Sequence, residues 1–175
     1  MTAASIYTER CEMESDIVGH LPRLYAEAAI GNAQVIELGV RTGNSTSAFL
    51  AAVEQHGGHV WSVDNGQIDV PFMDHPQWTF IWGDDEFVAD ELPDDVDVLF
   101  IDTSHFYRDT LRELNQYVPK VRAGGVVLMH DTELGRQIPK EPTYPVRQAM
   151  ERYCRRHALK PEYVPGWCGL GVIRL

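Results

Sequence analysis

The sequence has no long hydrophobic run and few cysteines. No segment approaches the ~20 consecutive apolar residues that a membrane-spanning helix needs, and the N-terminus lacks the apolar core of a signal peptide. The three cysteines, Cys11, Cys154 and Cys168, are an odd number without CxxC spacing. This pattern indicates free thiols in a reducing compartment. We therefore expect a cytoplasmic protein that does not use a membrane as a partner.

Positive charge is also scarce. The 15 basic and 26 acidic side chains give a formal net charge of 15 − 26 = −11, and no Lys/Arg-rich stripe offsets it locally. A chain this acidic repels a phosphate backbone, so nucleic acid is not expected as a partner. The acidity suits neutral or cationic small molecules, although a well-solvated surface explains it equally well.

What the chain does contain is a regular alternation of strand and helix patterns over 175 residues, with no internal repeat. This length predicts one domain, residues 1–175. The first thirty residues look helical, with a second short helix starting near Pro22. Strands are expected at 34–38, 59–64, 79–84, 96–102 and 124–131, and helices at 44–57, 85–92, 108–118 and 146–158. Asn44 and Ser45 are both suitable N-caps for the first of these later helices.

Such an alternation predicts an α/β fold, with a parallel sheet covered by helices on both faces. The last two strand patterns, "PEYVPG" and "GLGVIRL", lie close enough in sequence to form an antiparallel hairpin around Trp167 and Cys168. Ligands of parallel α/β sheets bind beyond the carboxyl ends of the strands. That rule directs attention to the residues that follow each strand.

The loop after the first strand, "GVRTG" (39–43), is rich in glycine but fits neither common phosphate-binding motif. Arg41 occupies the place of the middle glycine in G-x-G-x-x-G, which disfavours an NAD-dependent oxidoreductase, and no Gly-Lys-Ser/Thr follows. Glu37 precedes the loop, where a carboxylate suits an ammonium group or accepts backbone N–H bonds. Asp64 ends the second strand 64 − 43 = 21 residues after Gly43, where an acid can accept both ribose hydroxyls. The expected ligand is a nucleoside with a cationic, amino-acid-like group, which describes S-adenosylmethionine.

At this point the sequence resembles a known family. "VIELGVRTGNST", "VWSVDNG", "FIWGDDEF", "VDVLFIDTSHFYRDTLREL" and "AGGVVLMHDT" are similar to successive motifs of class I S-adenosylmethionine-dependent methyltransferases, from about Val35 to Thr132. The resemblance implies a Rossmann-like, doubly wound sheet of seven strands, mostly parallel, with an antiparallel C-terminal strand. It also implies that the glycine loop holds the methionine end, Asp64 the ribose, and the loop at Asp84 the adenine. The cofactor-binding residues expected are Glu37, Gly39, Val40, Arg41, Thr42, Gly43, Ser45, Asp64, Asn65, Gly83, Asp84, Asp85 and Asp102.

Candidate catalytic side chains follow the fourth and fifth strands. Asp102 and His105 come after one, His130 and Asp131 after the other, and adjacent strands lie about 4.8 Å apart. Asp102 and Asp131 can therefore converge on one cation, and His105 can take a proton from a substrate hydroxyl.

Within the family this arrangement resembles the metal-dependent O-methyltransferases of the macrolide-sugar type, with Asp102-Thr103-Ser104-His105 matching their Asp-x-x-His element. His130 departs from their pattern, because it replaces one acid of a pair. As a ligand it would favour Mn²⁺, Fe²⁺ or Zn²⁺ over Mg²⁺; alternatively, it is not a ligand, or no metal binds.

The sequence thus predicts an S-adenosylmethionine-dependent O-methyltransferase that acts on a hydroxyl of a small molecule or sugar. Asp102 and His105 are the expected catalytic residues, and Asp102, Asp131 and His130 the expected ligands of a divalent metal. The alternative is a non-catalytic protein that binds S-adenosylmethionine or S-adenosylhomocysteine on the same fold. Only the N-terminal helices (1–32) and the loop 133–144 are left to cover the cleft. We therefore expect either an open site for a large or extended acceptor or a lid contributed by the second subunit of a homodimer.

Overall fold

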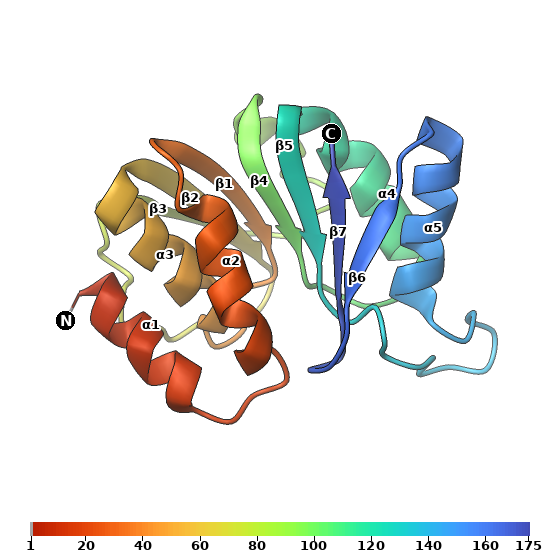
Figure 1. The fold of residues 1–175 in the computed structure, drawn as a ribbon, viewed down its shortest axis with the longest axis horizontal. Helices are drawn as coiled ribbons and strands as arrows, with labels where there is room; N and C mark the ends of the chain where they lie inside the picture. Colours follow the sequence, from red (N-terminus) through yellow and green to blue (C-terminus); the bar gives the residue numbers. More distant parts are fainter. Residues whose placement is uncertain (1) are drawn as a thin grey trace.

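The computed structural model describes residues 2–175, which form one seven-stranded sheet with helices on both faces (Figure 1). The strands lie in the order β3-β2-β1-β4-β5-β7-β6. The first five pair in parallel, whereas β7 is antiparallel to both β5 and β6. The strands are β1 (Ala33–Leu38), β2 (Gly58–Asp64), β3 (Trp78–Trp82), β4 (Val96–Ile101), β5 (Val121–Met129), β6 (Pro161–Val164) and β7 (Leu170–Arg174). The predicted fold class and the C-terminal hairpin around Trp167 and Cys168 are confirmed.

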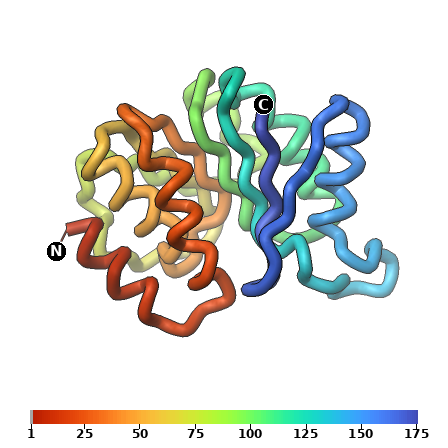
Figure 2. The backbone as a smooth tube through the Cα atoms, viewed as in Figure 1, coloured from red at the N-terminus to blue at the C-terminus, as the bar shows by residue number. Residues whose placement is uncertain are grey.

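The helices divide between the two faces of the sheet, as the chain trace in Figure 2 shows. On one face α1 and α2 pack against α3, and on the other α4 packs beside α5. The helices are α1 (Ala3–Glu12), α2 (Leu21–Ala28), α3 (Asn44–His56), α4 (Tyr107–Tyr117) and α5 (Pro145–His157), with short 3-10 turns η1 (Val18–His20), η2 (Ala89–Glu91) and η3 (Val118–Lys120).

Each central strand contributes to two hydrophobic cores, because successive side chains point to opposite faces. Val98 and Phe100 of β4 pack toward α3, while Leu99 and Ile101 pack toward α4. All four are at most 3% exposed. A strand apolar on both faces is what a central parallel strand requires.

Two local predictions are wrong. The expected helix over 85–92 is only the 3-10 turn η2 (Ala89–Glu91). The carbonyl oxygens of Asp85 and Glu86 accept side-chain hydrogen bonds from Tyr117 and Gln116 of α4, which fixes this part of the chain against α4 outside a helix. Neither Asn44 nor Ser45 caps α3. Its N-cap is Gly43, in the left-handed conformation (φ 76°), and the Ser45 hydroxyl donates to Glu37 instead.

No helix within residues 2–175 is both long enough and apolar enough to cross a membrane. The cytoplasmic location remains a prediction.

Candidate active site

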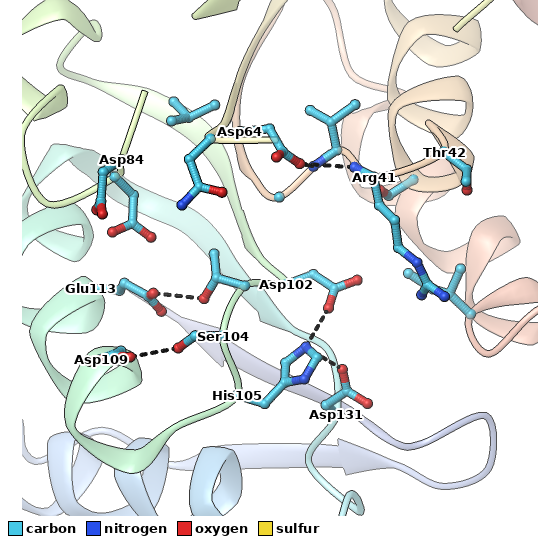
Figure 3. A pocket seen from close by; sticks show the side chains of 18 of the residues that line it. Arg41, Thr42, Asp64, Asp84, Asp102, Ser104, His105, Asp109, Glu113 and Asp131 are labelled. Atoms are coloured by element: carbon cyan, nitrogen blue, oxygen red, sulfur yellow. Dashed lines mark hydrogen bonds and ion pairs between the residues drawn. The ribbon is translucent and has the colours of Figure 1, made fainter. Parts of the chain in front are cut away.

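A pocket of about 380 Å³ opens at the carboxyl edge of the parallel strands, which is the place that sheet topology favours for a ligand. Its walls come from the loops after β1, β2, β3, β4 and β5 and from α4 (Figure 3). Of the thirteen residues predicted to bind the cofactor, eleven line it: Gly39, Val40, Arg41, Thr42, Ser45, Asp64, Asn65, Gly83, Asp84, Asp85 and Asp102. Glu37 and Gly43 do not.

The glycine loop is fixed to the end of β2 by Asp64. The Asp64 Oδ2 atom accepts the backbone N–H groups of Val40 and Arg41 at 2.7 and 2.9 Å, and Oδ1 accepts that of Gly66. Gly39 has φ 92°, and a Cβ there would overlap the carbonyl oxygen of Asp102. Glycine is therefore required both by the backbone conformation and by the close approach of β4.

Glu37 lies beneath this loop and is fully buried. Its carboxylate accepts hydroxyl hydrogen bonds from Ser45 (2.6 Å), Thr46 (2.8 Å) and Ser62 (2.5 Å). Burial raises the pKa of Glu37 to about 7, although these three hydroxyls oppose the shift. The carboxylate thus holds the start of α3 against β2. Its contact with the ammonium group of the ligand stays a prediction.

The pocket's far wall includes three α4 residues that were not predicted from the sequence, Asp109, Arg112 and Glu113. Arg112 forms an ion pair with Asp85 (2.6 Å). The Glu113 Oε1 atom accepts a hydrogen bond from Thr103 (2.7 Å), while the buried Oε2 has no hydrogen-bond partner. Burial, together with the nearby Asp85 carboxylate, raises the pKa of Glu113 to about 8.

A signal for Glu113 does exist in the sequence. It stands on the helix face that also carries Thr110, Leu114 and Tyr117, all of them buried. A carboxylate on an apolar helix face has to find a polar partner inside the protein.

Asp102, His105 and Asp131 form a compact cluster at the ends of β4 and β5, and each offers one ligand atom within 4.8 Å of the others. Figure 3 shows the His105 ring between the two carboxylates, with Nε2 at 3.2 Å from Asp102 Oδ1 and 2.8 Å from Asp131 Oδ2. Burial opposes protonation of this imidazole, but the two carboxylates outweigh it and raise the pKa of His105 to about 9. The same contacts lower the pKa of Asp131 despite its burial.

Three of the residues that line the pocket have a left-handed backbone conformation. His105 and Asp131 both have φ 61°, and Arg41 of the glycine loop has φ 51°. Non-glycine residues adopt this conformation at a cost of order 1–3 kcal/mol each, and such residues cluster at functional sites.

His130 is placed differently from the other three. Its Nε2 lies 2.8 Å from the carbonyl oxygen of Trp167 and 3.3 Å from that of Asp16, so an N–H there donates to the backbone. Its buried Nδ1 faces Asp131 Oδ2 at 3.1 Å without hydrogen-bond geometry. His130 therefore links β5 to the hairpin and to the N-terminal segment, and its predicted role as a metal ligand stays a prediction.

The N-terminal segment between α1 and α2 covers one side of the pocket. Asp16 and Ile17 line it, and Asp16 forms an ion pair with Arg41 (2.8 Å). The segment is anchored at its other end, because the buried His20 bonds to the carbonyl oxygen of Gly166 in the hairpin. Among the N-terminal residues only Asp16 and Ile17 of this connecting segment line the pocket, and the placement of the N-terminal helices over the cleft stays a prediction.

This sheet order, with a glycine loop after β1 and acids after β2, β3 and β4, defines a class I S-adenosylmethionine-dependent methyltransferase. A family model described as "Methyltransferase domain" matches residues 36–132, more than half of the chain. The protein therefore belongs to the methyltransferase-domain family, and the predicted class is confirmed.

Solved structures share the fold at low sequence identity. The S-adenosylhomocysteine-bound Podospora anserina methyltransferase PaMTH1 has a TM-score of 0.64 at 14% identity, covering 98% of this chain and 87% of its own. The O-methyltransferase NovP has a TM-score of 0.62 at 16% identity, and the match covers 90% of this chain and 79% of NovP. MycE from the mycinamycin biosynthetic pathway was solved with Mg, S-adenosylhomocysteine and mycinamycin VI. It has a TM-score of 0.62 at 17% identity, and the match covers 90% of this chain and 48% of MycE. No curated protein matches the sequence.

Proposed function

We propose that the protein transfers the methyl group of S-adenosylmethionine to a hydroxyl of a small molecule such as a sugar. The observation that carries this proposal is the placement of Asp102, His105 and Asp131 in the same pocket as the glycine loop. A cofactor held by that loop would have its reactive methyl beside a cluster able to orient and deprotonate an acceptor.

Different residues of the pocket would bind different parts of the cofactor. The loop 39–45 would hold the methionine end, and Asp64 and Asn65 the ribose. Gly83, Asp84 and Asp85 would hold the adenine. Asp64 is suited to its role because its backbone hydrogen bonds already fix its carboxylate at the pocket edge.

The cluster also fits a divalent metal. Two carboxylates and an imidazole supply three ligand atoms, and the mixed nitrogen and oxygen set favours Mn²⁺, Fe²⁺ or Zn²⁺. Asp102 and Asp131 would hold the ion, with the imidazole of His130 as the candidate nitrogen ligand, because its Nδ1 faces both carboxylates. The imidazole of His105 would then stay off the ion and keep a nitrogen that can accept a proton. When bound, such a cation orients substrate oxygens and lowers the pKa of a hydroxyl.

The proton role of His105 depends on these carboxylates. With both of them against its Nε2, the imidazole stays protonated up to pH near 9. His105 therefore accepts a proton near neutral pH only when Asp102 and Asp131 are engaged by another positive group. The non-catalytic alternative gains no specific support, because the candidate base lines the same pocket as the cofactor loop.

Calorimetric titration tests the proposal. S-adenosylmethionine and S-adenosylhomocysteine are titrated into the protein with EDTA, and then with Mn²⁺ or Mg²⁺. We expect micromolar binding of both nucleosides, with an additional metal-dependent heat that Asp131→Asn abolishes. Binding of neither nucleoside would overturn the assignment of the pocket, whereas nucleoside binding without any metal effect would remove the metal alone.

A further inference from the structure

Helix α5 presents an exposed cluster of positive charge on an otherwise acidic protein. Its C-terminal half and the following turn carry Arg152, Arg155, Arg156 and Lys160, all of them exposed. Within residues 2–175 none of the four has an acidic partner within 4 Å, in contrast to Arg147, which pairs with Glu151. We call these four residues the basic end.

A matching cluster of negative charge lies in the segment 84–95, between β3 and β4. It contains seven acids and no Lys or Arg. Asp85 pairs with Arg112 and Asp94 with Lys120, which leaves 7 − 2 = 5 acids without an ion pair among the described residues. One of the five, Asp84, lines the pocket. The other four are exposed: Glu86, Asp90, Glu91 and Asp95. We call these four residues the acidic strip.

The two clusters flank the same helix. The side chains of Arg112, Gln116 and Tyr117 on α4 all bond to the segment that carries the acidic strip. On its other side α4 packs against α5. Figure 1 shows α4 behind the C-terminal strands and α5 at the right, beside β6. The acidic strip, α4 and the basic end of α5 therefore follow one another across one face of the protein.

We propose that a second copy of this chain binds here, with the basic end of each copy on the acidic strip of the other. A twofold axis that lies in the interface and runs parallel to α4 places the basic end of one copy opposite the acidic strip of the other. The same contact then forms on both sides of the axis, and the dimer is closed. Phe87, within the same segment, is 77% exposed and would be covered in such a dimer.

Two further observations favour a second copy over another partner. The acidic strip supplies the complement of the basic end within the same chain, so two copies bring opposite charges together locally although each carries a net charge of −11. A nucleic acid would meet the same net charge and would offer no positive partner for the acidic strip. The face is also large enough. α5 has 13 residues and is about 20 Å long, and three neighbouring elements span about 30 Å. A face of these dimensions has an area of about 600 Å², which approaches the about 800 Å² of surface that each partner contributes to a standard interface.

Analytical ultracentrifugation of the full chain tests the proposal. At about 50 mM salt we expect a dimer, and at about 1 M salt a monomer, because the screening length falls to about 3 Å. The double variant Arg155→Glu/Arg156→Glu should raise the dimer dissociation constant at least tenfold, as should Asp90→Lys/Glu91→Lys on the other side. Combining all four substitutions restores opposite charges across the axis and should restore the dimer.

The matched control is Arg136→Glu/Lys140→Glu, which makes the same charge change in the exposed loop before α5 and should leave the dimer intact. A monomeric wild type at low salt would overturn the proposal, as would a dimer that both reversals leave unchanged or that the combined variant fails to recover. Because the readout is mass alone, the result is independent of whether the protein transfers methyl groups.

Discussion

His105 is the side chain on which the proposed proton transfer depends most directly. Its Nε2 contacts both carboxylates of the cluster, whereas its contribution to the hydrophobic cores is small. We predict that His105→Ala lowers kcat about 10²- to 10⁴-fold and changes the dissociation constant for S-adenosylhomocysteine less than about threefold. Steady-state kinetics and calorimetry measure the two effects separately.

The control for this variant is His59→Ala. His59 bonds to Thr79 at the opposite end of the sheet from the pocket and should leave both constants unchanged. If His105→Ala retains full turnover, another group removes the proton and the assigned role is wrong.

Glu113 gives a prediction about stability and pH. Its pKa rises from about 4.5 in the unfolded chain to about 8 in the folded protein, so the folded state binds the proton more tightly. Its stabilising contribution is complete below pH 4.5 and is lost as the pH rises toward 8. The slope is up to about 1.4 kcal/mol per pH unit. Glu113→Gln should remove this slope and become more stable than the wild type at alkaline pH.

Urea denaturation at several pH values measures the slope for Glu113→Gln against the exposed control Glu86→Gln. If wild type and Glu113→Gln lose stability in parallel between pH 5 and pH 8, Glu113 is ionised in the folded protein throughout that range. The effects of burial and of the neighbouring Asp85 carboxylate on the pKa of Glu113 would then be smaller than its position indicates.

Sequence alone could identify Asp64, Asp102 and Asp131, because the carboxyl ends of parallel strands meet at one edge of the sheet. The sequence could also single out Glu37 and Glu113 as acids in apolar surroundings, but it could not reveal which groups they contact. The hydroxyl of Ser62 lies 25 positions along the chain from Glu37, and Asp85 lies on a different element from Glu113. Contacts of that kind depend on tertiary packing, which no local pattern encodes.

At the scale of elements, the strands and long helices were predictable because their periodicity follows from which side chains are buried. The segment 85–92 was not. Its acids and apolar residues allow a helical spacing, but the carbonyl oxygens of Asp85 and Glu86 accept side-chain hydrogen bonds from α4 instead. The start of α3 differed for a related reason, since the capping candidate Ser45 donates its hydroxyl to Glu37. Side chains that bond to more than one possible partner limit the prediction of element boundaries.

The contact between η1 and the hairpin can be tested with a glycine. A Cβ on Gly19 would overlap the indole ring of Trp167, whereas a Cβ on Gly31 has no atom within 4 Å. We predict that Gly19→Ala lowers the free energy of unfolding by about 1–3 kcal/mol through overpacking. It should also shift the fluorescence of Trp167 toward that of a water-exposed indole. Gly31→Ala should stay within about 0.5 kcal/mol of the wild type. Equal stability of the two variants would show that the hairpin moves aside without cost.

At the scale of the whole molecule, the N-terminal helices are part of the core rather than an attached lid. Ile6 of α1 and Leu21 and Leu24 of α2 are at most 2% exposed, and they pack in the same cluster as Phe49 of α3 and Phe100 of β4. A chain that lacked α1 and α2 would expose that cluster to water. This continuity is the physical basis for expecting residues 1–175 to behave as one domain.

We therefore predict one cooperative unfolding transition, in which far-UV circular dichroism and tryptophan fluorescence give the same midpoint. The two probes report on different parts of the molecule. Circular dichroism reports mainly on the helices of both faces, whereas Trp61, Trp78 and Trp82 lie on β2 and β3 and Trp167 lies in the C-terminal hairpin. S-adenosylhomocysteine at 100 times its dissociation constant should raise the free energy of unfolding by about 2.7 kcal/mol without splitting the transition. An earlier loss of helical signal, unaffected by the nucleoside, would instead mean that α1 and α2 unfold separately from the sheet that carries the pocket.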